Sequence, residues 1–210
     1  MTPNPTIILH GGSRLSGHSH RAELMLRLLG LPYEYRTIDL RKGEHRTPAF
    51  LALNPFGTVP VIEDGEIIVP DSVAILVYLA SCYDSARRWL PADPIGAAKV
   101  QRWLSVAQGP VFNGPNTARL IKLFGRPGDH ERAAAIAQQL LQILEAELQA
   151  RAFLVGDAPT IADVALYSYV ARAPDGEVGL DDYPAVRSWL ARIEALPGFV
   201  AMPAPKADAA

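Results

Sequence analysis

The stretch VPVIEDGEIIV, residues 59–69, contains two short apolar runs separated by turn residues. The runs are Val59–Ile62 and Ile67–Val69, and the pair Asp64-Gly65 lies between them. An Asp-Gly pair between apolar runs favours a tight β-hairpin, because Gly adopts a positive φ at no steric cost. The stretch therefore predicts two antiparallel strands.

The residues around this hairpin predict a small mixed sheet. Thr6–Leu9 is rich in strand-forming residues, and apolar residues then recur at helical spacing from Ala22 to Leu29. Tyr33–Leu40 alternates loosely, as a second strand does, and a strand–helix–strand order favours a parallel crossover. An apolar helix over Asp71–Ala80 follows the hairpin. The N-terminal part is thus predicted to be an α/β domain with helices on the faces of its sheet.

After this region the strand signals nearly vanish and helical patterns dominate. Residues 83–93 are polar with two proline-containing turns, which predicts a linker. Three apolar stripes at helical spacing follow: Val100, Trp103, Leu104 and Ala107; Ile136, Leu140, Ile143 and Leu144; and Val186, Trp189, Leu190 and Ile193. The chain is predicted to hold an α/β domain over residues 1–82 and an all-α helical bundle over residues 94–210. The Pro/Ala-rich end, residues 203–210, is expected to fray.

The composition excludes several classes of protein. The 210 residues include 20 Lys and Arg against 22 Asp and Glu, which gives a formal net charge of −2 and no general attraction to nucleic acid or anionic membranes. A single cysteine excludes an internal disulfide framework and a multi-cysteine zinc site, so no metal is expected. The N-terminus lacks a signal-peptide pattern and no apolar run is long enough to span a membrane, so a cytoplasmic protein is expected.

Ser13–Arg21, between the first strand and the first helix, is the first candidate site. Unpaired N–H groups at a helix start favour an anion, and a serine hydroxyl there can donate a hydrogen bond to it. Taken alone, such a serine is better explained as an ordinary N-cap, because serine is preferred at that position. Ser19 is the simpler cap, which leaves Ser16 with less of a structural explanation. His18 and His20 do not share a helix face and are interpreted as surface histidines.

Two further segments combine a structural and a functional interpretation. Pro60 stands just before a strand, where it removes a ladder donor. A cis turn would expose the N–H and C=O of Val59 to a ligand's peptide group, and a strand-initiating proline is the plain alternative. Asp71 and Ser72 are ordinary helix caps, but they also place a carboxylate and a hydroxyl where an amino acid's ammonium and carboxylate can be held.

Two other features predict structure rather than chemistry. Thr160 followed by Asp163 matches a capping box, with Asp in place of the usual Glu or Gln, and predicts the start of a buried helix. Cys82 ends an apolar helix and is expected to be a small buried residue rather than an exposed thiol.

In this order and spacing, the candidate segments resemble the cytosolic glutathione transferase family over nearly the whole chain. The resemblance implies a thioredoxin-like N-terminal domain and an all-helical second domain, as in a bacterial member with serine-type motifs. The stretch Gly43–Pro48, running on to Asn54–Gly57, is similar to the phi class. Ser16 matches the activating serine of the phi, tau and zeta classes. His18 stands near the position of the beta-class cysteine, which argues against mixed-disulfide chemistry of the protein's own thiol.

The resemblance also implies a set of glutathione contacts. Val59 before a cis Pro60 matches the residue whose backbone pairs with the cysteinyl peptide, and Asp71 with Ser72 matches the pair that binds the γ-glutamyl end. The other implied contacts are His45 and Arg46 with the glycine carboxylate, and Thr58, which stands where the family often has Gln or Lys.

The implied activity is that of a glutathione S-transferase, with glutathione as co-substrate. Ser16 would donate to the glutathione thiolate, which attacks an electrophilic, mainly apolar second substrate. The candidate walls of that substrate's pocket are Leu15, Phe112, Asn113 and Arg119, and Phe112 taken alone fits the core as well. The alternatives are a glutathione-dependent disulfide or peroxide reductase and a non-catalytic glutathione-binding module. A homodimer is also implied.

Overall fold

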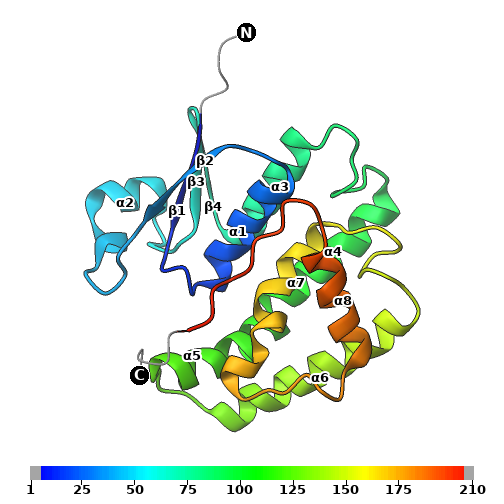
Figure 1. Ribbon diagram of the computed structural model, residues 1–210. Coiled ribbons are helices and arrows are strands. Elements are labelled where there is room, and N and C mark those ends of the chain that lie inside the picture. Colours follow the sequence, from blue (N-terminus) through cyan, green and yellow to red (C-terminus); the bar gives the residue numbers. More distant parts are fainter. Residues whose placement is uncertain (1–5, 206–210) are drawn as a thin grey trace. The chain divides into compact units, whose positions relative to one another are not determined.

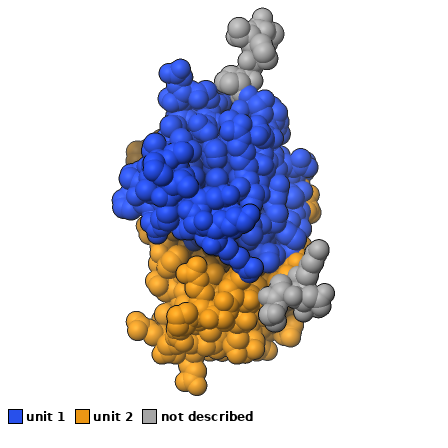
Figure 2. Space-filling view, turned by 90° about the vertical axis from the view of Figure 1, so that its left-hand side faces the viewer, with its two compact units in different colours: residues 1–85, 197–203 blue, residues 86–196, 204–210 orange. Residues whose placement is uncertain are grey.

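The computed structural model describes residues 6–205 (Figure 1), and its internal contacts divide the chain into two units (Figure 2). Within the described residues, unit 1 comprises residues 6–85 together with Pro197–Pro203, and unit 2 comprises Ala86–Leu196 with residues 204–205. The sequence placed residues 197–203 in the helical domain, whereas their contacts group them with the N-terminal unit. The expected fraying of the C-terminal end falls mainly on residues 206–210, which lie outside the described residues.

Unit 1 is built on a four-stranded mixed sheet in the order β2-β1-β3-β4. Strand β1 (Ile7–Gly11) pairs in parallel with β2 (Tyr33–Thr37) and antiparallel with β3 (Val61–Asp64). Strand β2 is shorter than the predicted strand over residues 33–40. Strand β3 pairs antiparallel with β4 (Ile67–Pro70). This arrangement confirms the thioredoxin-like fold of the N-terminal unit.

The predicted hairpin forms with a two-residue turn. Asp64 pairs with Ile67, so Gly65 and Glu66 make the turn, and Gly65 adopts φ 61° as such a turn requires. Strand β3 begins only at Val61, directly after a cis Val59-Pro60 peptide bond.

Helices cover both faces of this sheet (Figure 1). Helix α1 (Gly17–Leu28) packs against α3 (Ser72–Tyr83) on one side, and α2 (Pro48–Leu53) lies on the other. The core between the sheet and α1 and α3 includes the fully buried side chains of Leu9, Met25, Ile62 and Leu76. Burial of each side chain of this size contributes about 1.5–3 kcal/mol. Cys82, near the end of α3, is exposed, so the prediction that it is buried was wrong.

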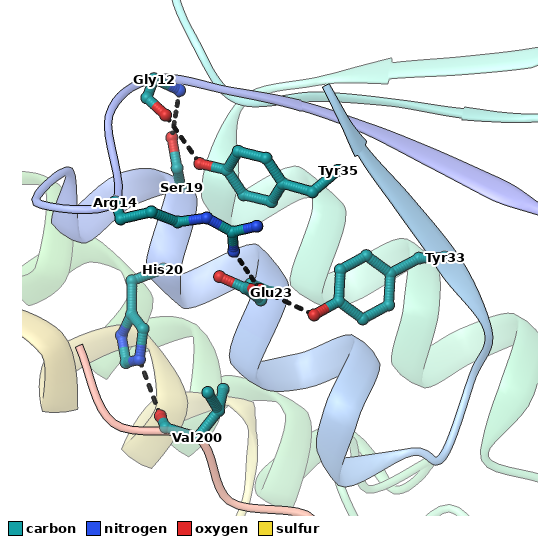
Figure 3. A network of polar contacts seen from close by, with 8 residues as sticks. All are labelled: Gly12, Arg14, Ser19, His20, Glu23, Tyr33, Tyr35 and Val200. Atoms are coloured by element: carbon teal, nitrogen blue, oxygen red, sulfur yellow. Dashed lines mark hydrogen bonds and ion pairs between the residues drawn. The ribbon is translucent and has the colours of Figure 1, made fainter. Parts of the chain in front are cut away.

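The segment Pro197–Pro203 completes unit 1 by packing along α1. The Nε2 atom of His20 donates to the carbonyl oxygen of Val200 at 2.8 Å, a contact drawn in Figure 3. Gly198 has φ 85°, and a Cβ on it would lie 2.4 Å from the carbonyl oxygen of Arg27, so only glycine fits this approach. Since His20 is only 3% exposed, its interpretation as a surface histidine was wrong.

Unit 2 is helical. Its helices are α4 (Pro94–Gln108), α5 (Thr117–Phe124), α6 (His130–Gln149), α7 (Ile161–Ala171) and α8 (Pro184–Glu194), with a π-helical turn at Phe112–Asn116 and 3₁₀ turns including Ala173–Gly176. The first and third predicted apolar stripes, on α4 and α8, are buried throughout. Within residues 6–205, no helix combines the length and apolar character that crossing a bilayer requires.

The stripe predicted on α6 is partly wrong. Leu140 and Leu144 are buried as predicted, but Ile143 is 45% exposed, and the buried face of α6 also includes the small residues Ala133 and Ala137. A Cβ on Gly114 would lie 2.9 Å from the backbone nitrogen of Ala137, so the π-helical turn packs directly against the α6 backbone. This close approach is possible because Gly114 and Ala137 are both small. A pattern of large apolar side chains does not predict it.

The capping box at the start of α7 is present and organises the core of unit 2. Asp163 is fully buried and accepts hydrogen bonds from the Thr160 N–H at 2.8 Å and the Leu154 N–H at 3.0 Å. The indole of Trp189 on α8 donates to the same carboxylate at 2.9 Å. Trp103 on α4 donates to the Leu154 carbonyl at 3.1 Å, so this carboxylate organises a network that ties α4, α7 and α8 together.

The variant Asp163→Ala tests this arrangement. It leaves three buried donors without an acceptor, and each such donor costs about 1–3 kcal/mol, so we expect the free energy of unfolding to fall by at least about 3 kcal/mol in urea titrations. Asp157→Ala, at an exposed position six residues earlier, is the matched control and should change it by less than about 0.5 kcal/mol. Equal losses in the two variants would contradict the structural role of Asp163.

Candidate active site

Ser16 is the N-cap of α1 and is half-buried. Its backbone is extended at φ −80° and ψ 112°, and its Oγ accepts from the Ser19 N–H at 3.3 Å. The prediction that Ser19 is the cap was therefore wrong. Ser19 lies inside the first turn of α1 and is 1% exposed, so Ser16 is the serine of this pair with access to solvent.

The loop before Ser16 is held from both sides (Figure 3). The Ser19 hydroxyl accepts from the Gly12 N–H at 2.9 Å, and the Tyr35 hydroxyl donates to the Gly12 carbonyl at 2.8 Å. A Cβ on Gly11 would lie 2.2 Å from the Tyr35 hydroxyl oxygen, so glycine is required next to this ring. Both backbone hydrogen-bonding groups of Gly12 are therefore satisfied, and these two contacts hold the loop against α1.

Charged and aromatic side chains support Tyr35. The Arg14 guanidinium lies 3.6 Å above the Tyr35 ring centre and pairs with Glu23, which also accepts from the Tyr33 hydroxyl at 2.7 Å (Figure 3). Burial and the Glu23 carboxylate raise the pKa of Tyr33 to about 12, and burial raises the pKa of Tyr35. Both phenols therefore remain protonated donors at neutral pH. This network was not predicted from the sequence, although Tyr33 and Tyr35 are two positions apart on one strand and so point to the same face.

The starts of α1 and α3 meet at Ser72. Its hydroxyl accepts from Nη1 of the fully buried Arg21 at 3.0 Å and lies 3.2 Å from Nδ1 of His18. Burial, together with the Arg21 charge, lowers the pKa of His18 to about 3, so its imidazole is neutral at physiological pH. The surface interpretation of His18 was therefore wrong. Two helix N-termini and a buried cation give this region a strong preference for anions.

Asp71 precedes Ser72 in an unusual backbone conformation. Its φ is 76°, which costs a non-glycine residue of order 1–3 kcal/mol. Its Oδ1 accepts from the N–H groups of Val73 and Ala74 at 2.8 and 3.0 Å, so it is the predicted cap of α3. The residue is exposed, and strained exposed residues of this kind are concentrated at ligand sites.

The cis peptide at Val59-Pro60 lies beside the Ser16 loop. A Cβ on Gly12 would lie 3.3 Å from Cγ2 of Val59 and 3.6 Å from Cβ of Ser16, so both side chains border the same glycine. Within the described part of the chain, the N–H and C=O of Val59 have no hydrogen-bond partner. This backbone edge is therefore available to pair with an extended ligand.

The remaining predicted contacts of unit 1 lie on the connection between β2 and β3. Thr58 is exposed, and its hydroxyl and carbonyl accept from the Asn54 side-chain amide at 2.9 and 2.8 Å. Arg46 is exposed with Nη1 3.5 Å from the Phe56 carbonyl, and His45 is half-buried. The guanidinium of Arg46 thus remains accessible to an anion.

The predicted pocket residues have different environments. Leu15 is half-buried in unit 1, next to Ser16. In unit 2, Phe112 is 43% exposed and Asn113 is exposed, so the alternative that Phe112 belongs to the core was wrong. Arg119 is 1% exposed and pairs with Asp175 at 2.8 Å, which is an interior scaffold contact and not the accessible wall expected from the sequence.

The described residues include no group of three or more His, Cys, Asp or Glu side chains placed to hold a metal ion. The candidate residues of unit 1 contribute hydroxyl, backbone and cationic groups. These groups can bind an extended peptide-like anion and stabilise a negative charge near Ser16.

Comparisons with known proteins agree with these features. Residues 15–82 match the glutathione S-transferase N-terminal domain, and residues 128–197 match the C-terminal domain. Glutathione S-transferase 3 of Zea mays is 36% identical over 90% of this chain and 89% of its own length. A crystal structure of a Pseudomonas fluorescens glutathione S-transferase has a TM-score of 0.87 at 33% identity, covering 93% of this chain and 98% of that one. The crystal structure of a Drosophila mojavensis glutathione transferase homologue with bound glutathione has a TM-score of 0.82 at 29% identity, covering 91% of this chain and 89% of that one.

The lowered pKa of His18 predicts a pH-dependent stability. In the unfolded chain, His18 is protonated below its ordinary pKa of about 6.5, whereas in the folded protein it is protonated only below about pH 3. Between these two pH values the unfolded chain binds more protons, so the free energy of unfolding falls as the pH drops. We expect His18→Gln to remove about 1–2 kcal/mol of the stability difference between about pH 7.5 and pH 5. Urea titrations of both proteins at the two pH values measure it. If the free energy of unfolding changes equally between the two pH values in both proteins, His18 is not the source of the pH dependence.

Proposed function

This chain belongs to the glutathione S-transferase family, and we propose that unit 1 binds glutathione with its thiol next to Ser16. As a member of this family it is a glutathione transferase, which conjugates glutathione to an electrophile. The observation that carries the proposed site is the placement of the Ser16 hydroxyl at the N-terminus of α1, where it is half-buried. It lies beside the backbone of Val59, which has no hydrogen-bond partner among residues 6–205. A homologue whose structure contains bound glutathione supports the choice of ligand.

The groups of unit 1 match the parts of glutathione. The N–H and C=O of Val59, next to the cis Pro60, pair with the cysteinyl peptide group. Asp71 and the buried Ser72 hold the γ-glutamyl end. The additional proposed contacts are His45 and Arg46 for the glycine carboxylate, and Thr58 on the adjoining loop.

The energy required for thiol ionisation is within reach of these groups. A free thiol has a pKa of about 8.5, and lowering it by about 2 units requires roughly 2.7 kcal/mol of preference for the thiolate. One hydroxyl donor to a charged group contributes about 1.5–3 kcal/mol, and a helix N-terminus adds up to about 1 kcal/mol. Ser16 with the start of α1 is therefore sufficient. Ser16 acts as a hydrogen-bond donor and not as the nucleophile.

The position of Cys82 favours conjugation over chemistry at a protein thiol. Cys82 is the only cysteine of the chain, and it lies ten residues after Ser72 on the same helix, which is about 15 Å along the axis. The reactive thiol at Ser16 is therefore that of glutathione. A panel of aryl halide, peroxide and mixed-disulfide substrates separates conjugation from the reductase alternative, and calorimetric titration with glutathione tests the non-catalytic one.

We further propose a cytoplasmic homodimer acting in detoxification, with an apolar electrophile as second substrate. The family membership supports these proposals, and sedimentation measures the oligomeric state. Leu15, Phe112 and Asn113 are retained as proposed contacts of the electrophile. Arg119 is not retained, because its guanidinium already pairs with Asp175 in the interior.

The variant Ser16→Ala tests the main proposal. Loss of the donor should raise the pKa of the bound glutathione thiol by about 1–2 units and lower kcat/KM about 10–100-fold below that pKa. Thiolate absorbance of the glutathione complex and the pH profile of kcat/KM measure these effects. Ser13→Ala, an exposed serine of the same loop, is the matched control. An unchanged pH profile in Ser16→Ala would refute the role of this residue.

The variant Phe112→Ala tests the proposed contact with the electrophile. It removes an exposed aromatic surface, so KM for an apolar aryl halide should rise about threefold to tenfold while KM for glutathione stays constant. Phe124→Ala, at another partly exposed phenylalanine of unit 2, is the control. Equal effects on both Michaelis constants would argue against a specific contact with the electrophile.

A further inference from the structure

We propose that Ser19, which is buried beneath Ser16, is a positioning residue that holds the Ser16 hydroxyl with its hydrogen directed toward the bound thiolate. The inference rests on the proposed role of Ser16 and adds a second residue to it. Ser19 lies in the first turn of α1, and its Oγ is 3.2 Å from the Oγ of Ser16. At 1% exposure, Ser19 is not accessible to a ligand.

The hydrogens of the two hydroxyls determine the direction of this contact. Each serine hydroxyl has one hydrogen and two acceptor positions. When Ser16 donates its hydrogen to a thiolate, it has none left for Ser19, so the contact between the two oxygens requires Ser19 to donate. Ser16 also accepts from the Ser19 N–H at 3.3 Å. Both acceptor positions of Ser16 are then filled from within the helix, and its hydrogen is left to point outward.

The surroundings of Ser19 favour the same direction. Its Oγ accepts from the Gly12 N–H at 2.9 Å and also contacts the Tyr35 hydroxyl. When Ser16 donates to the thiolate, the single Ser19 hydrogen is directed to the Ser16 oxygen, because that contact then has no other hydrogen. The Gly12 peptide is fixed in turn by the Tyr35 hydroxyl, which donates to its carbonyl at 2.8 Å, and Arg14 lies over the Tyr35 ring (Figure 3). A continuous set of contacts therefore runs from β2 to the Ser16 hydroxyl. Hydrogen bonds in such a chain strengthen one another, so a Ser16 hydroxyl that accepts from Ser19 is the better donor.

The expected effect is on ionisation of the thiol and not on affinity. In Ser19→Ala, the pKa of bound glutathione should rise by about half a unit, which corresponds to roughly a threefold loss of kcat/KM below that pKa. KM for glutathione should stay within about twofold, because Ser19 does not touch the ligand. Ser19→Thr keeps the hydroxyl and should restore the wild-type pH profile. A residue that only stabilised the fold would lower the active fraction without shifting this profile.

The experiment measures thiolate absorbance and the pH profile of kcat/KM for the full-length protein and four variants. These are Ser19→Ala, Ser19→Thr, Ser16→Ala and the double variant, with Ser13→Ala as the control for loss of a hydroxyl in this loop. If Ser19 acts through Ser16, Ser19→Ala shifts the thiol pKa in the wild-type background and not in the Ser16→Ala background. Should Ser19→Ala fail to fold, Ser19→Cys replaces it, because its weakly donating S–H group should shift the profile in the same direction.

Two results overturn the inference, and a third identifies a different failure. The inference is wrong if Ser19→Ala leaves the thiol pKa unchanged while Ser16→Ala raises it. It is also wrong if Ser19→Ala shifts the pKa equally in both backgrounds, since Ser19 would then act independently of Ser16. If Ser16→Ala itself leaves the pKa unchanged, the proposed role of Ser16 fails, and the role of Ser19 fails with it.

Discussion

The unsatisfied N–H groups at the start of a helix are the constraint on which unit 1 depends. The unit brings two such starts together, those of α1 and α3, and must provide acceptors for both. Ser16 and Asp71 supply caps, and Ser72 accepts from the buried Arg21 between the two helices. The hydroxyl of Ser16 carries no charge, so its cap leaves the positive end of α1 uncompensated, and the Arg21 guanidinium adds a buried positive charge nearby. The same features that complete the fold therefore create a site for an anion.

Rigid packing of the strand-to-helix loop connects this electrostatic preference to chemistry. Gly11 allows the Tyr35 ring to approach the backbone more closely than any side chain would permit, and the Tyr35 hydroxyl then holds the loop in place through the Gly12 carbonyl. A hydroxyl stabilises a thiolate only when its hydrogen points at the sulfur, so fixed orientation matters as much as the presence of the serine. In the proposed mechanism, the polar contacts behind Ser16 therefore contribute to the reaction without touching the substrate.

Much of the fold was predictable from the sequence because it depends on local patterns. The Asp-Gly turn, the apolar stripes of α4 and α8, and the capping box at Thr160 each involve residues a few positions apart. The errors concern contacts between distant residues or helix ends. Residue His20 is buried by Val200, 180 positions later, and Arg119 pairs with Asp175, 56 positions later. The choice between two serines as the cap of α1 depended on a helix boundary that spacing alone does not locate.

The packing of Pro197–Pro203 along α1 has a consequence for how the protein is made. The sheet and helices of unit 1 leave the ribosome first, but the segment that covers His20 and approaches Arg27 is among the last to be synthesised. Until then the imidazole of His20 lacks its carbonyl acceptor, although the whole glutathione-binding sequence already exists. The first unit to be translated is therefore completed only after all the helices of unit 2 have been made, and a nascent chain that stops at the end of α8 carries an unfinished N-terminal unit.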